Sequence, residues 1–404
     1  MTNHFSLGMT KATELTKAGK LDEATALIQS LLKGTVPETP VEADPTVIEG
    51  QFTRLDDAGR VDEPIRQHPK QQTDKQAKKQ AEPQTEKPTN PPRNRASLRE
   101  TLRSIAAGGM PDHAPFGKAD TPIPVGAQFV TLTHRNPQGQ RDYKLYIPAN
   151  RPVAPMPLIV MLHGCTQSPD DFATGTGMNA LAEKHGFYVA YPAQPVGANA
   201  NKCWNWFKPE DQARDRGEPA VIAGLVRDIL REHRVDPARV YIAGLSAGGA
   251  AAAIVATAYP ELFSAAGVHS GLAVGAASDI PGAFSAMRGG AGGASLARAV
   301  PMIVIHGTAD ATVHPRNGKA VADQMLHAFD GLQATARKGV SANGRAYRKT
   351  SHALGDGRSM VEYWEINGAG HAWAGGHAAG SFTDPTGPDA SAEMLRFFLQ
   401  HQQG

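Results

Sequence analysis

The sequence has little cysteine, few aromatic residues and no long apolar run. Two cysteines, Cys165 and Cys203, occur among 404 residues, which excludes a disulfide-rich scaffold and a cysteine-ligated metal site. Apolar runs such as residues 158–162 fall far short of the about 18 residues that a membrane-spanning helix requires. A net charge of +2 favours no particular class of partner.

Residues 1–32 contain no continuous apolar segment and no cleavage-site pattern, so the sequence predicts no secretory leader. We therefore expect a cytoplasmic protein without a membrane span. The alternative is an extracellular protein that is exported without a recognisable leader.

Aromatic residues are absent from residues 53–115, which are rich in proline, glutamine and lysine. This composition cannot bury enough apolar surface to offset chain entropy, so residues 35–119 are expected to form a disordered linker. Its second half is basic and could bind a polyanion. Without interleaved aromatic residues a solvated tether is favoured, and no nucleic-acid partner is expected. A capping-box pattern predicts one short helix over residues 97–107.

Residues 6–33 carry a helical pattern. The apolar residues spaced along one helix face are Ala24, Leu27, Ile28 and Leu31. Gly19 can separate this helix from an earlier one, which predicts a helical hairpin over residues 1–34 that resembles a single tetratricopeptide-type repeat. One such unit cannot bury its own apolar face. Two interpretations stay open: the hairpin binds a protein or granule partner, or it packs on the main domain or forms only in part.

Residues 120–404 alternate strand-like and helix-like segments. The expected strands are 128–132, 143–147, 158–162, 188–191, 240–243, 265–268, 302–305 and 360–366. The expected helices include 221–233, 316–329 and 390–400. An opening pair of strands followed by alternating units predicts a mostly parallel sheet with helices on both faces.

Ser246 lies in the motif Gly244-Leu245-Ser246-Ala247-Gly248, between an apolar strand pattern and an alanine- and glycine-rich helix pattern. A serine on a tight strand-to-helix turn holds its hydroxyl clear of its own backbone, and the flanking glycines remove side chains that would clash. This context predicts a nucleophile and, with the order of strands and helices, the α/β-hydrolase fold. The alternative is a tight turn whose serine has no function.

A serine hydroxyl needs a base that takes its proton and an acid that orients the base. In this fold both follow the serine in the chain. Asp310 comes just after the strand at 302–305 and His371 just after the strand that ends at Ile366, so both are expected at the sheet edge of Ser246. The alternatives are a loop-capping aspartate and a surface histidine. The substitute candidates are His377, Asp384 and Asp389.

Attack on a carbonyl places negative charge on its oxygen, which needs fixed N–H donors. One expected donor is the Ala247 amide, which follows the nucleophile at a helix start. The second is expected after the strand at 158–162, where the Cys165 amide can point into the site. The alternative is that His163-Gly164 only ends the strand. This chemistry needs no cofactor and no metal.

Five segments form an ordered set. They are HGCTQ at 163–167, YPAQ at 191–194, NKCWNWF at 201–207, DPARVYIAGLSAGG at 236–249 and HGTAD at 306–310. Together they resemble the poly(3-hydroxybutyrate) depolymerase family of esterases, which is related to feruloyl and acetylxylan esterases. The likeness covers roughly residues 125–400.

The resemblance implies a serine esterase that cleaves poly(3-hydroxybutyrate) or short-chain hydroxyalkanoate oligomers through an acyl-enzyme, with Ser246, Asp310 and His371 as its triad. A carbohydrate esterase that removes feruloyl or acetyl groups is the second candidate. The third is of another class: a non-catalytic interaction protein that keeps the hydrolase fold as a scaffold for its hairpin and tether.

Three tryptophans, Trp204, Trp206 and Trp373, lie in segments near the expected site. A flat apolar surface there would suit a polyester chain or an aromatic acyl group, whereas an anchoring role in the core or loops is equally compatible. Cys165 and Cys203 belong to loops expected at the same sheet edge. They either form a disulfide that braces the oxyanion loop or stay as thiols in a reducing cytoplasm.

Overall fold

The computed structural model describes residues 123–296 and 298–403. The predicted hairpin at 1–34 and the predicted linker at 35–119, with its helix at 97–107, lie outside the described residues. Over the described part of the chain, none of the helices has the length and apolar character needed to cross a membrane.

The described residues form one ten-stranded sheet and a separate pair of short strands. The strands of the large sheet are β1 (Gln128–Asn136), β2 (Gly139–Ile147), β3 (Met156–Leu162), β4 (Tyr188–Pro192), β5 (Val235–Leu245), β6 (Ala265–His269), β7 (Met302–Gly307), β8 (Gln333–Val340), β9 (Ala346–Ala353) and β10 (Ser359–Ile366). The short strands are β11 (Trp373–Ala374) and β12 (Thr383–Asp384).

The large sheet has a parallel centre and antiparallel ends. Its strand order is β1-β2-β4-β3-β5-β6-β7-β10-β9-β8. Every neighbouring pair from β4 to β10 in this order is parallel, whereas β1, β2, β9 and β8 extend the sheet in antiparallel pairs. Since neighbouring parallel strands run the same way, β5, β6, β7 and β10 end at one edge, and the loops that follow them meet there.

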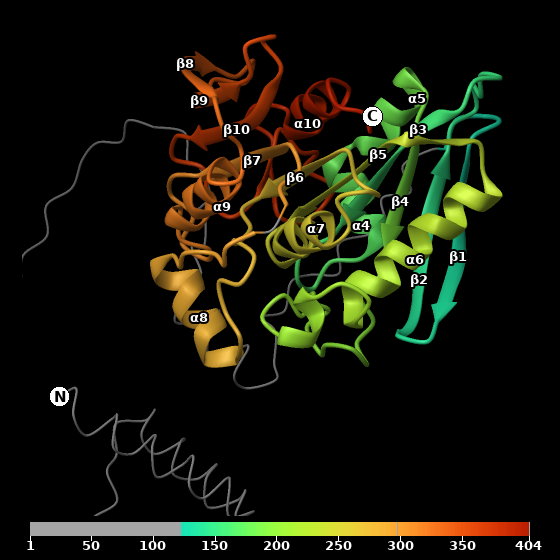
Figure 1. Ribbon diagram of the computed structural model, residues 1–404. Helices are drawn as coiled ribbons and strands as arrows, with labels where there is room; N and C mark the ends of the chain where they lie inside the picture. The colour runs from blue at the N-terminus through green and yellow to red at the C-terminus, as the bar shows by residue number, and fades with distance from the viewer. Residues whose placement is uncertain (1–122, 297, 404) are drawn as a thin grey trace, which may run out of the picture. The chain divides into compact units, whose positions relative to one another are not determined.

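Helices cover both faces of the sheet, as parallel connections require. They are α4 (Pro169–Thr176), α5 (Met178–His185), α6 (Gly217–Glu232), α7 (Ala247–Ala258), α8 (Ile280–Gly289), α9 (Arg316–Leu326), α10 (Ala390–Phe398) and the 3-10 helix η1 (Pro209–Gln212). One face packs against α6, α7, α8 and α9, and the other against α4, α5 and α10. Figure 1 views the sheet from the side of α6 and α7.

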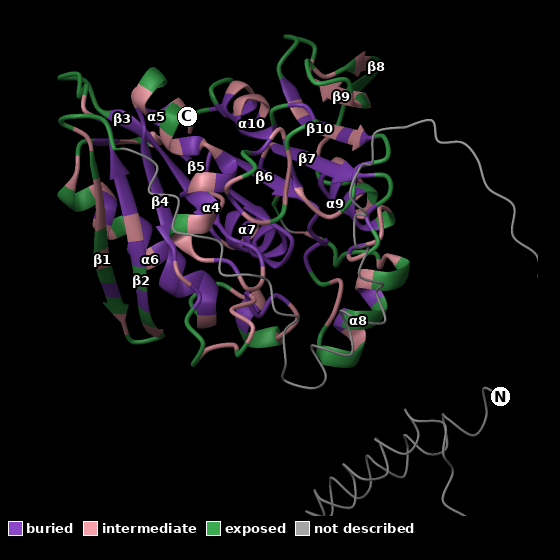
Figure 2. Ribbon diagram, turned by 180° about the vertical axis from the view of Figure 1, so that it is seen from behind, coloured by how far each residue is buried: buried purple, intermediate pink, exposed green. Residues whose placement is uncertain are grey.

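Each central strand contributes alternately to the two cores. In β3, Leu158, Val160 and Leu162 face the core of α6 and α7, while Ile159 and Met161 face the core of α4, α5 and α10, and all five are fully buried. A continuous apolar run is therefore what a two-sided strand needs. Figure 2 shows β3, β4, β6 and β7 in the colour of buried residues.

The predicted strands all lie within observed ones, and the predicted α/β-hydrolase architecture is correct. The β8–β9 hairpin was not predicted from the sequence. β8 is exposed at almost every residue and β9 is mostly half-buried, so neither strand carries the apolar alternation that would mark it.

Candidate active site

Ser246 stands on a sharp turn between β5 and α7. Its backbone angles, φ 58° and ψ −121°, are strained for a residue with a side chain. The turn needs glycine two residues further on, because a Cβ on Gly248 would lie 2.1 Å from the carbonyl oxygen of Leu162. The Ser246 amide donates to the His269 carbonyl over 2.9 Å, which ties the turn to the end of β6.

Backbone strain gathers around this turn. Among the described residues that are not glycine, six have positive φ, and four of them lie at or next to the site. These four are Thr166, Lys202, Ser246 and Ser270. Each such position costs on the order of 1–3 kcal/mol and persists only where the surrounding structure imposes it.

Asp310 and His371 meet at the same sheet edge. The Nδ1 atom of His371 lies 2.7 Å from Asp310 Oδ2. The Oδ1 atom of Asp310 accepts the amides of Thr312 and Val313 over 2.9 and 2.8 Å, so the carboxylate is fixed in orientation. The Asp310 side chain is completely buried, while that of His371 keeps 12% of its surface exposed. The imidazole is therefore the member of the pair that an incoming molecule can reach.

A second histidine also holds the Asp310 carboxylate. The Nε2 atom of His306 lies 2.8 Å from the Val313 carbonyl, which can only accept, so Nε2 carries a proton. The same atom lies 3.4 Å from Asp310 Oδ2. Burial alone would raise the pKa of Asp310, but the hydrogen bonds from His306 and His371 hold that pKa below its usual range. Asp310 is thus an anion at neutral pH.

His269 links the serine turn to the loop of His371. Its carbonyl accepts the Ser246 amide, and its ring Nε2 accepts the Ala374 amide over 3.0 Å. Burial lowers the pKa of His269 to about 3, so the ring is neutral and can accept this bond. In the described structure Ser246 Oγ makes no hydrogen bond to His371. In unliganded enzymes such bonds are often long and tighten only in the reacting complex.

The two expected oxyanion donors lie on neighbouring turns. The Ala247 amide is at the first position of α7, where a helix offers it no acceptor. The Cys165 amide donates to none of the described residues. A Cβ on Gly164 would come within 3.6 Å of the Leu245 carbonyl, so the Cys165 loop abuts the serine turn. Both amides are thus available for a ligand at this edge.

A disulfide joins Cys165 to Cys203, 38 residues apart in the chain. The buried carboxylate of Glu218 holds the segment around Cys203 through hydrogen bonds. Glu218 accepts the Asn205 amide over 2.9 Å and the Gln194 side chain over 2.5 Å, and Gln194 in turn donates to the Cys203 carbonyl. Burial raises the pKa of Glu218. The Cys165 loop is therefore fixed covalently and by a polar network.

The three tryptophans are buried, in contrast to the expectation of a flat surface beside the nucleophile. Trp204, Trp206 and Trp373 expose 0%, 5% and 1% of their surface. Trp204 Nε1 donates to the His163 carbonyl over 3.0 Å, and Trp373 Nε1 donates to Ser391 Oγ over the same distance. Their burial and these hydrogen bonds favour the anchoring role over that of a flat surface beside the nucleophile.

The substitute acid and base candidates have other partners. Asp384 pairs with Arg345 over 3.0 Å, Asp389 caps α10, and the His377 Nδ1 atom accepts the Ala379 amide over 3.2 Å. Sequence reasoning did not single out His269 or His306. Their position at the ends of adjacent parallel strands was the available signal. Over residues 123–296 and 298–403, no three histidine, cysteine or acidic side chains group as metal ligands would.

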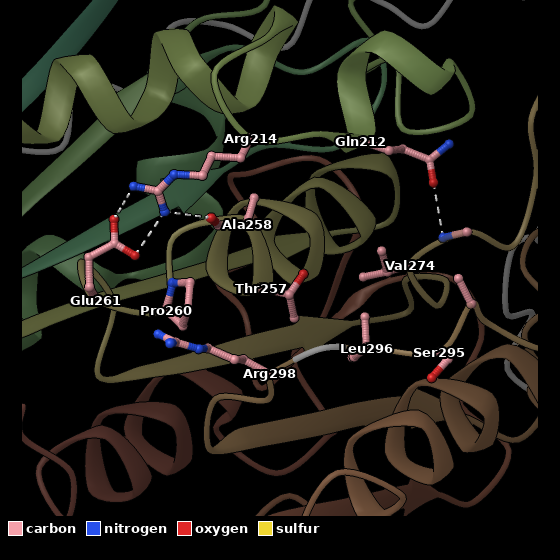
Figure 3. A pocket seen from close by; sticks show the side chains of 12 residues that line it. Gln212, Arg214, Thr257, Ala258, Pro260, Glu261, Val274, Ser295, Leu296 and Arg298 are labelled. Carbon is pink, nitrogen blue, oxygen red and sulfur yellow. Dashed lines mark hydrogen bonds and ion pairs between the residues drawn. The ribbon is translucent and has the colours of Figure 1, made fainter.

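The hollow in Figure 3 is separate from this edge. It has a volume of about 530 Å³ and is lined by Thr257 at the far end of α7, with an ion pair between Arg214 and Glu261 at one side. Ser246 is at the other end of that helix, about 17 Å away at 1.5 Å per residue. The site is therefore recognised by its side-chain arrangement and not by the size of a cavity.

The fold and the site define a class of protein: an α/β-hydrolase with a serine on its strand-to-helix turn. Among solved structures, the acetyl xylan esterase from Aspergillus awamori matches this fold with a TM-score of 0.52 at 22% identity, over 68% of this chain and 99% of that one.

Sequence comparison gives the family. The family model described as esterase PHB depolymerase matches residues 141–346. Poly(3-hydroxyalkanoate) depolymerase C of Paucimonas lemoignei is 35% identical over 250 residues, which are 58% of this chain and 59% of the depolymerase. Feruloyl esterase B of Neurospora crassa is 30% identical over 302 residues, 69% of this chain and 94% of that enzyme. The chain belongs to the esterase PHB depolymerase family, although its match spans only about three fifths of the depolymerase.

Proposed function

We propose that this protein is a serine esterase that hydrolyses ester bonds of poly(3-hydroxybutyrate) or of short-chain hydroxyalkanoate oligomers. The observation that carries the proposal is the hydrogen bond of 2.7 Å between His371 and Asp310, at the sheet edge of the Ser246 turn. Acyl transfer needs three groups: a carboxylate, an imidazole that the carboxylate orients, and a nucleophilic hydroxyl, which here stands on a strained turn.

In the first half of the reaction, Asp310 keeps the proton of His371 on Nδ1, so the lone pair of Nε2 is free. Nε2 takes the proton of Ser246 Oγ while Oγ bonds to the ester carbonyl carbon. The Cys165 and Ala247 amides donate to the oxygen that becomes negative. The bond to the alcohol then breaks, and His371 returns its proton to the leaving alkoxide.

In the second half, water replaces the alcohol. His371 takes a proton from the water as its oxygen attacks the acyl carbon on Ser246. The bond to Oγ breaks, Oγ regains the proton from His371, and the hydroxy acid leaves. The enzyme returns to its starting state without any cofactor.

The hydroxyalkanoate substrate rests on the family and on the depolymerase relative. A carbohydrate esterase that removes feruloyl or acetyl groups is the second candidate, because the match extends over 94% of a feruloyl esterase. Initial rates on 3-hydroxybutyrate oligomers, polymer granules and methyl ferulate, measured side by side, separate the two. Higher kcat/KM on methyl ferulate than on the oligomers would replace the polyester proposal.

The catalytic proposal is tested with Ser246→Ala. We expect it to lose labelling by a fluorophosphonate probe and to lose turnover by a factor of about 10⁴ or more. Ser351→Ala, the same substitution in β9, is the matched control and should react as the wild type does. Undiminished turnover in Ser246→Ala would remove Ser246 from the mechanism, whereas absence of turnover in the wild type would favour the non-catalytic scaffold.

We further propose that residues 120–404 form the catalytic domain and that the protein works in an oxidising, extracytoplasmic compartment. The family match within this range supports the first statement, and the Cys165–Cys203 disulfide supports the second, since reducing compartments keep thiols free. Removal of residues 1–115 should leave turnover of small esters nearly intact. A large loss would assign part of the site to the removed residues.

A further inference from the structure

The helix α8, which is inserted between β6 and β7, exposes its large apolar side chains and buries its small ones. Ala283 and Ala286 are buried against the core of α7 and α9, whereas Ile280 and Phe284 expose 57% and 36% of their surface. Because apolar burial stabilises a fold in proportion to area, a helix that only packed on its own domain would turn its large side chains inward. An exposed apolar face of this kind marks a surface that contacts another body.

The helix is fixed to the sheet edge of the candidate site. The Met287 carbonyl, in the last turn of α8, accepts the amide of His314 over 2.7 Å. The residue before it, Val313, donates its own amide to the Asp310 carboxylate. The buried side chain of Asn317 also donates to a carbonyl of the last turn of α8. Figure 1 shows α8 standing out from the sheet below α9. The exposed face of this helix is therefore held next to the loop of Asp310.

A cation continues the apolar face. Ile280, Phe284 and Arg288 are spaced four residues apart, so they lie on one side of the helix. Arg288 is exposed and has no ion-pair partner among the described residues. Asp279, which precedes the helix, accepts the Gly282 amide over 2.6 Å as its cap, so that carboxylate is already engaged. The side of α8 that faces solvent thus presents two apolar side chains and an unpaired positive charge.

A solid hydroxyalkanoate polyester has the matching chemistry. Its chains carry alkyl groups and uncharged esters, and each ester bond that is hydrolysed leaves a carboxylate at a chain end. A solid cannot enter the protein, so the surface around Ser246 has to meet it when one of its ester bonds reaches the serine. Val196, in the loop after β4, is also exposed at this edge, on the other side of β5 in the strand order. Exposed apolar side chains therefore flank the serine turn on both sides.

We propose that the α8 face, formed by Ile280, Phe284 and Arg288, is a docking surface for solid hydroxyalkanoate polyester. This inference rests on the proposed esterase function and assigns a physical state to its substrate. The two apolar side chains leave water when they contact the polymer, and Arg288 pairs with carboxylate chain ends. Docking raises the local concentration of ester bonds at Ser246 and leaves the chemical steps as they are.

Adsorption and hydrolysis are measured separately. In the Ser246→Ala background, which leaves the polymer intact, we expect Ile280→Ser/Phe284→Ser to weaken binding to a poly(3-hydroxybutyrate) film about 10-fold or more, since both apolar contacts are lost. With Ser246 present, the same pair of substitutions should slow film hydrolysis by the same factor at low enzyme concentration. Its kcat/KM on the soluble 3-hydroxybutyrate trimer should stay within about twofold of the wild type, because a short oligomer reaches the serine from solution.

Three variants serve as controls. Ile280→Leu/Phe284→Leu keeps two large apolar side chains and should adsorb as the wild type does. Val153→Ser/Leu399→Ser removes two apolar side chains that are exposed elsewhere, before β3 and after α10, and should also adsorb as the wild type does. Arg288→Gln should weaken binding to a partly hydrolysed film about two- to threefold, and high salt should remove that difference.

The inference is overturned if Ile280→Ser/Phe284→Ser adsorbs to the film as the wild type does. It is also overturned if this variant loses as much kcat/KM on the soluble trimer as it loses on the film, which would make α8 part of the site itself. Sedimentation tests the other occupant: a wild-type dimer that the two substitutions separate into monomers would assign the α8 face to a second copy. Failure of the proposed function looks different, because the wild type would then hydrolyse neither film nor trimer.

Discussion

Two regions of the same sheet differ in how they are built. One is the edge at which β5, β6 and β7 end, and the other is the β8–β9 hairpin. At the edge, positive φ falls on serine, threonine and lysine as well as on glycines such as Gly368, whereas in the hairpin region it falls on glycines such as Gly344 and Gly357. Glycine adopts these angles without strain, and the others do not. Strain is therefore kept where the candidate site lies and avoided where the chain only turns.

Burial differs in the same way. The strands β6 and β7 are buried at every residue, while β8 is exposed at all but one. Figure 2 shows this contrast across the sheet. A polar network in a buried region keeps its geometry, because each group lacks water as a substitute partner. We therefore expect substitutions at the edge to lower both catalytic activity and the free energy of unfolding, whereas substitutions in the hairpin should change neither.

After the loss expected for Ser246→Ala, the largest expected effect is that of Asp310→Asn. The amide can donate to His371 and favour the wrong ring tautomer, so kcat should fall by about 10³–10⁴. Steady-state kinetics at pH 7 measure it. Asp356→Asn, in the turn after β9, is the control and should leave kcat unchanged. Retention of more than a tenth of the wild-type kcat in Asp310→Asn would remove this residue from the mechanism.

Loss of the disulfide should come next. For the 38-residue separation of Cys165 and Cys203, the chain-entropy model gives about 4 kcal/mol of stabilisation. The double variant Cys165→Ser/Cys203→Ser should lose that free energy in urea unfolding, and its kcat should fall because the oxyanion loop is freed. Wild type treated with dithiothreitol should match it. Equal stability of variant and wild type would mean that the hydrogen bonds alone hold the loop.

A lower pH should reduce the free energy of unfolding through the buried histidines at the edge and not through residues of the hairpin. Burial lowers the pKa of His163 to about 4 and of His269 to about 3, from 6.5. The unfolded chain takes up both protons near pH 6.5 and the folded chain does not, so stability is full above pH 6.5 and falls as the pH drops toward 4. Each histidine contributes about 1.4 kcal/mol per pH unit in that window.

Urea unfolding at pH 7, 6 and 5 measures this slope. His163→Gln should reduce the change of unfolding free energy per pH unit by the contribution of one proton. His352→Gln in the half-exposed part of β9 is the comparison, and its slope should lie closer to that of the wild type. If His163→Gln kept the pH dependence of the wild-type unfolding free energy, the His163 ring would have to be charged in the folded wild type.

The smallest expected effect lies in the hairpin. Val340 at the end of β8 exposes 64% of its surface, so Val340→Ser should change the free energy of unfolding by less than about 0.5 kcal/mol. Activity on small esters should be unchanged. Val304→Ser in β7, where the side chain is fully buried, is the matched substitution and should cost several times more. Equal losses of unfolding free energy in the two variants would contradict the expectation that burial sets the cost of these substitutions.

Local chemistry explains which parts of the molecule could be predicted from the sequence. The Ser246 turn is a short-range pattern of glycines between a strand and a helix, and Asp310 and His371 follow from chain order in this fold. The two-sided strands are apolar throughout, so they are visible as runs. The structure then brings Asp310 and His371 into one hydrogen bond, as their positions after parallel strands imply.

What was missed depends on packing. His269 joins two distant segments, at Ser246 and Ala374, that share no sequence pattern. His306 lies in the same short segment as Asp310, but a histidine at a strand end has the same appearance whether it is buried or exposed. For the tryptophans the sequence left a surface role and an anchoring role open, because their side chains suit both and only packing decides. The β8–β9 hairpin has no buried face, so its alternation is absent.

The outermost position of β8 in the sheet has one further consequence. An end strand has unpaired amides and carbonyls along its free side, and these can add a strand from another molecule. Arg337 and Lys338 lie on this strand and are exposed. Two copies that approached along it would bring like charges together. The charged side chains on this free edge therefore disfavour the addition of a strand from a second copy.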